Sequence, residues 1–259
     1  MPGFALWLAL ALSHSFAAAP SYSAASFLIA CNLANGPFAP NTIVSIYGSS
    51  LSWTQRSLTA DDIRSGYLPT NLDGVQVVVD NTVVPLFLVS DGQVNFLMPT
   101  NQVAGPVTVR VVREGTVGPA VSITLLDAAP ALFRTPDAPN YAIAQQWPEY
   151  SQIAPDTPTD PGRIVILYAE GLGRTRPYPS QSTEIPTYAA TLERFQDFHI
   201  YLNGQQLDSS KVLYAGLAPG WASLYQINFI LPDDIGPDPE LRIAVGDQMS
   251  MAGMKLAVR

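Results

Sequence analysis

The chain has 259 residues, of which 47% are hydrophobic and 13% are charged, and it contains 23 prolines and 18 glycines. A chain this apolar is not disordered, and its proline content fits poorly with long helices. The net charge of −8 repels phosphate backbones, so we expect no nucleic-acid partner. The length suits two domains of ordinary size, built from short strands joined by turns.

Residues 1–19 are predicted to be a signal peptide. An apolar run over residues 4–12 is followed by three alanines at positions 17–19, which is the pattern of a cleavage site, and the run is too short to span a bilayer. The basic residues that usually precede such a run are missing, since the first Lys or Arg is Arg56. We expect a protein that is secreted or held at the cell surface, with no membrane span.

Cys31 is the single cysteine of the chain, so no intramolecular disulfide is possible. The preceding residues Leu28-Ile29-Ala30 resemble a lipobox, at which an exported chain is cut and lipidated on the cysteine. More than a dozen residues separate Cys31 from the apolar run, however. This distance favours a small buried side chain in the first domain over a lipid anchor.

The first half of the chain predicts a strand-rich domain over residues 20–127. Its six predicted strands are residues 42–47, 75–79, 83–89, 93–98, 107–112 and 121–126. They are rich in Val, Ile and Thr, and Gly, Pro, Asn or Asp residues bound them, which is typical of strands joined by turns. Residues 52–71 are predicted to be a loop between the first two strands.

The second half predicts a similar domain over residues 161–259. Its predicted strands are residues 164–169, 198–202, 211–215, 224–231, 241–245 and 254–258, and Asn203-Gly204 is a typical hairpin turn. Residues 128–160 are rich in proline and are predicted to be a linker, in which residues 141–145 are a candidate strand of the second domain.

Two pairs of matching motifs relate the halves. Residues 40–51 read PNTIVSIYGSSL and residues 161–172 read PGRIVILYAEGL, an offset of 121 residues. Gln93-Val94-Asn95-Phe96 matches Gln226-Ile227-Asn228-Phe229 at an offset of 133 residues. A repeat of roughly 90 residues is too long for a solenoid unit and suits one β-sandwich. We therefore predict an all-β chain of two tandem β-sandwiches.

Several of these stretches resemble a known family. They are residues 24–27, 39–48 and 90–96 in the first half and residues 166–173, 214–220 and 224–228 in the second. The family is an uncharacterised, paralogue-rich set of domains at the C-terminal ends of secreted soil-bacterial proteins, and each half is similar to an IPT/TIG-type immunoglobulin-like domain. The resemblance implies an extracellular setting and two immunoglobulin-like (Ig-like) β-sandwiches, and it assigns no catalytic residue. Almost nothing precedes the pair here, so we expect the pair to act alone.

Catalytic and metal-binding side chains are scarce. His199 is the only histidine after the signal segment, and no G-x-S-x-G turn accompanies it, so we expect no nucleophilic triad, no zinc site and no cofactor. Asp61-Asp62 and Asp233-Asp234 are adjacent acids, most typical of solvated turns. A calcium ion between loops, or a glycosidase-like pair, is the weaker alternative.

Three tryptophans in predicted loops, Trp53, Trp147 and Trp221, are the candidate ligand-binding residues. Exposed aromatic side chains stack on sugars or anchor protein partners, although they also cover the ends of sandwiches. We predict a non-enzymatic module for adhesion or interaction, with an extracellular protein or polysaccharide as partner. A structural spacer is the first alternative, and a hydrolase using two carboxylates is the second.

Overall fold

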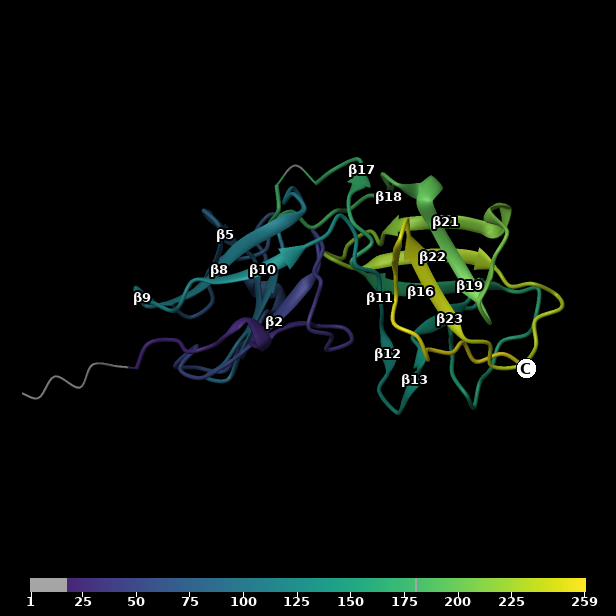
Figure 1. Ribbon diagram of the computed structural model, residues 1–259, viewed down its shortest axis with the longest axis horizontal. Coiled ribbons are helices and arrows are strands. Elements are labelled where there is room, and N and C mark those ends of the chain that lie inside the picture. The colour runs from purple at the N-terminus through teal and green to yellow at the C-terminus, as the bar shows by residue number, and fades with distance from the viewer. Residues whose placement is uncertain (1–17, 180) are drawn as a thin grey trace, which may run out of the picture.

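The computed structural model describes residues 18–179 and 181–259, so the predicted signal peptide lies outside it except for Ala18 and Ala19. The chain is almost entirely β-structure, which confirms the predicted all-β, Ig-like fold class. Figure 1 shows two β-sandwich domains that follow one another along the chain. The helices of the described residues are 3-10 turns of three residues each.

The first domain consists of two antiparallel sheets. Its strands are β1 (Phe27–Ile29), β2 (Ile43–Tyr47), β3 (Arg56–Ser57), β4 (Val75–Val79), β5 (Thr82–Val84), β6 (Leu86–Val89), β7 (Gln93–Leu97), β8 (Gly105–Arg113), β9 (Thr116–Val117) and β10 (Val121–Leu125). One sheet has the order β1-β2-β7-β6-β3 and the other the order β10-β8-β4-β5, with β9 paired to β8. Alternate residues of β4 are buried, as expected for a strand with one face in the core.

The second domain has a larger sheet, a smaller one and a two-stranded one. Its strands are β11 (Ala131–Leu132), β12 (Arg134–Thr135), β13 (Ala138–Ala142), β14 (Ala144–Gln146), β15 (Ser151–Ile153), β16 (Ile164–Glu170), β17 (Thr175–Arg176), β18 (Ala190–Leu192), β19 (Phe198–Leu202), β20 (Gln205–Gln206), β21 (Val212–Leu217), β22 (Tyr225–Ile230), β23 (Leu241–Val245) and β24 (Gln248–Met249). The larger sheet has the order β15-β14-β16-β22-β21-β18-β17, with β11 also paired to β16, the smaller has the order β20-β19-β23-β24, and β12 and β13 form the two-stranded sheet.

The stretch from residue 128 to 160 carries β11 to β15, and β14 pairs along β16. The predicted last strand, residues 254–258, is not one. Its residues make isolated bridges, in which Lys255 pairs with Tyr141 and Glu240, and Val258 pairs with Thr159. Because single residues pair with three separate segments, no continuous ladder forms there.

The matching motifs occupy equivalent places in the two domains. Tyr47 of β2 pairs with Gln93 of β7, and Tyr168 of β16 pairs with Gln226 of β22. In both domains the glutamine side chain donates a hydrogen bond to the asparagine two residues later, at 2.8 Å in the first copy and 2.9 Å in the second. The internal repeat is therefore a repeat of the same strand pair in the same register.

The domains are joined through β11. Its first residue, Ala131, is buried in the core of the first domain, and the next, Leu132, is buried in the core of the second. A second contact lies further from the chain connection, where Leu68 N donates to the Thr183 carbonyl at 2.8 Å and Ile185 N donates to the Gly66 carbonyl at 2.9 Å. The domains thus contact each other at separate places as well as along the chain.

The start of the described chain is bound to the side of the first domain opposite the joint. Arg113, at the end of β8, is 1% exposed, and its guanidinium donates to the Ala18 carbonyl at 2.6 Å and to the Ser50 carbonyl. A buried guanidinium is stabilised by such charge-assisted hydrogen bonds. Ala18 therefore belongs to the folded domain, although it falls within the predicted signal peptide.

Two chains that begin at Ala18 and at Pro20, each after one added methionine, test this contact. The shorter chain is expected to lose about 1–3 kcal/mol of unfolding free energy, because Arg113 loses an acceptor. Ala18→Ser in the longer chain keeps the carbonyl and is expected to leave the melting temperature unchanged. Equal melting temperatures for the two lengths would show that the contact is not stabilising.

Candidate functional site

Trp53 lies at the same end of the first domain and packs on charged side chains. The Arg113 guanidinium carbon lies 3.6 Å from the centre of its ring system, and its indole N–H donates to Glu114 Oε2 at 3.1 Å. A cation over an indole face stabilises both groups, more strongly when the cation is buried. One face of Trp53 is therefore occupied by its own protein, although the side chain remains half exposed.

Trp147 lies at the far end of the second domain, after β14. Its ring contacts the Tyr150 ring edge to face, with centroids 5.3 Å apart and planes at 79°. Its backbone N–H donates to the carbonyl of Ile164, at the start of β16. This aromatic pair lies in the turn between β14 and β15.

Trp221 lies in the loop between β21 and β22, close to the other end of the same sheet. It is 63% exposed, the highest value among the described tryptophans. Beside it is a groove of about 340 Å³ lined by Phe133, Ile143, Tyr168, Ala218, Pro219, Trp221, Leu224 and Gln226. The structure therefore keeps the three predicted tryptophans apart and places Trp221 beside this groove.

The floor of this groove, which we call the Trp221 groove, is the outer face of the larger sheet. Tyr168 and Gln226 are half-buried cross-strand partners that point away from the core, whereas their neighbours Leu167 and Ile227 point into it. Tyr168 Oη donates to Gln145 Oε1 at 2.6 Å, and Gln226 Nε2 donates to Asn228 Oδ1. Gln226 Oε1 makes no hydrogen bond with the described residues and is a free acceptor on the groove.

Two differences between the copies build the groove. In the first domain Val89 pairs with Val94, so the hairpin between the equivalent strands is tight. In the second domain Ala215 pairs with Ile227, which leaves a longer hairpin whose loop carries Trp221. The other wall, Phe133 and Ile143, comes from the segment between the repeats. The groove therefore has no equivalent at the repeated positions of the first domain.

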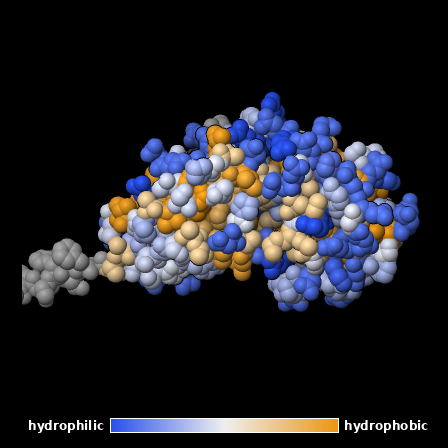
Figure 2. Space-filling view, viewed as in Figure 1, coloured by the Kyte–Doolittle hydropathy of each residue, from blue (hydrophilic) through white to orange (hydrophobic). Residues whose placement is uncertain are grey.

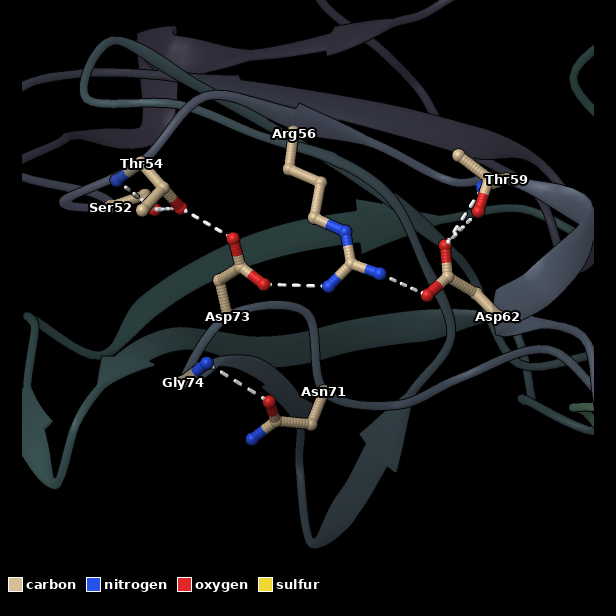
Figure 3. Close-up of polar contacts among 8 residues, drawn as sticks. All are labelled: Ser52, Thr54, Arg56, Thr59, Asp62, Asn71, Asp73 and Gly74. Carbon is tan, nitrogen blue, oxygen red and sulfur yellow. Dashed lines mark hydrogen bonds and ion pairs between the residues drawn. The ribbon is translucent and has the colours of Figure 1, made fainter.

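Two carboxylates of the first domain, Asp62 and Asp73, both contact Arg56. Figure 3 shows Arg56 between Asp62 and Asp73: its guanidinium donates to Asp73 Oδ1 at 2.6 Å and also to Asp62. Backbone and hydroxyl hydrogen bonds from Thr59 hold the pKa of Asp62 below its usual value, and the Arg56 hydrogen bond does the same for Asp73. Both carboxyls are ionised near neutral pH, so neither suits a general acid. The ion pairs of Arg56 with Asp62 and Asp73 hold the loop after residue 52 in place.

The second predicted acid pair lies in the other domain. Asp233 and Asp234 follow β22 at the end of the second domain that carries Trp147, whereas Asp61 and Asp62 form a 3-10 turn of the first. His199 lies in β19, where its Nδ1 is 3.1 Å from Gln206 Nε2. Within residues 18–179 and 181–259, no three His, Cys, Asp or Glu side chains gather closely enough to hold a metal ion.

A buried carboxyl that the sequence did not single out lies between the domains. Glu170, at the end of β16, is 1% exposed; its Oε1 accepts a hydrogen bond from Ser223 Oγ at 2.8 Å, and its Oε2 makes none with the described residues. Burial raises the pKa of Glu170 to about 7. The Ser223 hydroxyl, the Cys31 thiol and the N–H groups of Ile43 and Cys31 lower this pKa, but by less than burial raises it. The sequence signal that could have pointed to Glu170 is its position in the repeated motif, where the first copy has Ser49.

Cys31 lies beside Glu170 and packs against the core of the first domain. Burial, and secondarily the Glu170 carboxyl, raise the pKa of its thiol well above the ordinary value, so it stays a neutral thiol. Lipidation requires cleavage just before Cys31, which would remove β1 and its fully buried Phe27. The arrangement favours a packing role over the lipid anchor.

Figure 2 shows hydrophilic residues over most of the second domain on this face, with hydrophobic residues more frequent over the first. Among the described residues, no helix has the length and apolar character needed to cross a membrane.

Comparisons with known proteins give the domain type. Residues 30–125 match the sequence profile of the IPT/TIG domain, and no curated protein sequence matches the chain. Similar solved structures include SGBP-B of the Bacteroides ovatus mixed-linkage glucan utilization locus in complex with a mixed-linkage heptasaccharide, at 10% identity and a TM-score of 0.32, covering 85% of this chain and 43% of that one. Tandem Ig repeats of Dlar match at 13% identity and a TM-score of 0.20, covering 85% of this chain and 91% of that one.

This chain spans less than half of the SGBP-B structure. The resemblance to secreted soil-bacterial proteins stays a prediction. What the comparison establishes is that the chain contains an IPT/TIG domain at residues 30–125.

Proposed function

We propose that this protein is a non-enzymatic, secreted or surface-held interaction module that binds its partner at the Trp221 groove. The observation that carries the proposal is a 63% exposed tryptophan beside a groove of about 340 Å³ with a free amide acceptor. Keeping a large indole in water costs free energy that a binding partner would recover by covering it. The proposal includes export of the protein, which the predicted signal peptide at residues 1–19 supports.

The other two tryptophans support the choice of Trp221. Trp53 already stacks under Arg113, and Trp147 packs against Tyr150, so each has a partner within the protein. Trp221 also lies where the second copy differs from the first, in the lengthened β21–β22 hairpin. A loop added to a repeated scaffold, with a fixed sheet beneath it, is a common place for a binding residue.

The test is retention of the chain on insoluble polysaccharides and on the envelope of the source cell. Trp221→Ala is expected to lose about tenfold or more in affinity, as truncated aromatic anchors do. Trp53→Ala and Trp147→Ala are the matched controls and are expected to keep full affinity. All three variants are compared only if circular dichroism and melting curves show that they fold. Unchanged retention of Trp221→Ala on a matrix that binds the wild type would remove the groove from the proposal.

A structural spacer is the second candidate, and the joint between the domains favours it. The domains share β11, the Glu170 contact and the backbone hydrogen bonds of Leu68 and Ile185. Such a joint would hold neighbouring parts of a cell-surface assembly at a fixed spacing. The spacer function predicts no saturable binding to any matrix and no effect of Trp221→Ala beyond folding.

The carboxylate hydrolase receives the least support. A pair of carboxyls that acts on a glycosidic bond must lie about 5–10 Å apart across the substrate, and one must remain protonated. The predicted acid pairs lie in different domains, Asp62 binds Arg56, and Glu170 is 1% exposed. We therefore propose the non-enzymatic function.

A further inference from the structure

We infer that the Trp221 groove binds an uncharged polysaccharide, with the flat C–H face of one pyranose ring stacked on the Trp221 indole. This inference rests on the proposed function and names the class of its ligand. It follows from the size of the groove, from the charge of its lining and from the polar atoms that border the aromatic surface.

The size of the groove excludes a protein partner held by the groove alone. A stable protein interface covers about 800 Å² on each partner, over roughly 20–30 residues. The Trp221 groove has about 340 Å³ and eight lining residues, which is near the lower end of small-ligand sites. One or two sugar rings fit a site of this size, and the rest of a polymer would continue outside it.

The lining carries no formal charge. Its residues are aromatic, aliphatic or amide side chains, while the whole chain has a net charge of −8. An anionic polymer would meet repulsion from the protein without a Lys or Arg in the groove to offset it. A cationic polymer would find no carboxylate there. The ligand that fits this lining is neutral.

The polar atoms that border the groove suit sugar hydroxyls. A pyranose with mainly equatorial hydroxyls has a C–H face that packs on an aromatic ring and a rim of hydroxyls around it. Gln226 Oε1 is a free acceptor on the groove floor, and Tyr168 Oη, which donates to Gln145, can still accept a hydrogen bond. The indole thus supplies the stacking surface, and the floor supplies acceptors at its edge.

Binding isotherms on insoluble and soluble polymers test the inference. The probes are amorphous cellulose, xylan, mannan and starch as neutral polymers, and polygalacturonate as an anionic one. The wild type is expected to bind at least one neutral polymer saturably and to leave polygalacturonate unbound. Trp221→Ala is expected to weaken that binding about tenfold or more, and Gln226→Ala severalfold, while Trp147→Ala leaves it unchanged.

The outcomes separate this inference from the proposed function. Binding to polygalacturonate alone, or neutral binding that Trp221→Ala leaves intact, would overturn the inference. If no neutral polymer binds, but Trp221→Ala abolishes retention on the source cell's envelope, the ligand class is wrong and the interaction module stands. If the wild type binds neither polymers nor envelope, both are wrong.

Discussion

Glu170→Gln is expected to abolish a loss of stability that the wild-type protein undergoes as the pH rises from about 4.5 to 7. The native carboxyl has its pKa raised to about 7 by burial, so between these values the folded state binds more protons than the unfolded state. The contribution of Glu170 to the unfolding free energy therefore falls as the pH rises through this window and is constant above it. The expected fall is about 3 kcal/mol.

The ionisable groups around Glu170 keep their charge state between pH 4.5 and 7, so the variant changes only the titration of residue 170. The Cys31 thiol and the Tyr225 hydroxyl have raised pKa values and stay neutral in this window, and Arg134 lies close enough to act on Cys31. Denaturant melts of both proteins at pH 4.5 and pH 8 measure the effect. At pH 8 the variant is expected to be the more stable protein, because no buried charge remains. Parallel curves for wild type and variant across the window would show that Glu170 does not titrate there.

The matched control is an exposed acid, Glu193, whose pKa is lowered and not raised. Hydrogen bonds from Arg176 and Tyr178 lower the pKa of Glu193, so its contribution to stability is present above its unfolded pKa and is lost as the pH falls through the folded value. Glu193→Gln is therefore expected to leave the slope between pH 4.5 and 7 unchanged.

Gly171→Ala is expected to destabilise the protein by about 3 kcal/mol or more, and to lower its melting temperature by roughly 5–10 °C. Gly171 has φ +73°, and a Cβ there would lie 2.1 Å from the Ala129 carbonyl oxygen. That oxygen cannot move away easily, because Ala129 N donates to the Gly171 carbonyl at 2.7 Å, so the backbones of the joint are in direct contact.

Gly204→Ala is the control that separates the clash from the strain of a positive φ. Gly204 has φ +77°, and no atom lies within 4 Å of a Cβ placed there. Its substitution is expected to cost only about 1 kcal/mol. Similar losses for the two variants would show that the contact between Gly171 and Ala129 does not hold the joint.

The strands and the repeat could be predicted because their signals are local. Val75–Val79, Phe198–Leu202 and Leu241–Val245 have the predicted bounds, since runs of β-branched and apolar residues ended by turn residues define such strands. The strands of two or three residues that the sequence does not predict are β1, β3, β9, β11, β12, β15, β17, β18, β20 and β24. Two or three residues carry too little periodicity, and these strands form because a neighbouring strand offers them hydrogen bonds.

The site could be predicted only in part. A tryptophan in a loop is recognisable from the sequence as a binding candidate, but the sequence does not single out Trp221, because exposure is not a local property. Arg113 follows Trp53 by 60 positions and Phe133 precedes Trp221 by 88 positions, so only the fold shows that one indole is covered and the other borders a groove. Glu170 was missed because its burial depends on packing between the domains.

The most direct test of the Trp221 groove is a set of three binding isotherms on the source cell's envelope, measured with the wild type and with folded Trp221→Ala and Trp147→Ala. If the groove is the binding face, Trp147→Ala saturates at the wild-type concentration and Trp221→Ala requires about tenfold more protein or does not saturate. Three coincident isotherms would contradict a binding role for the groove.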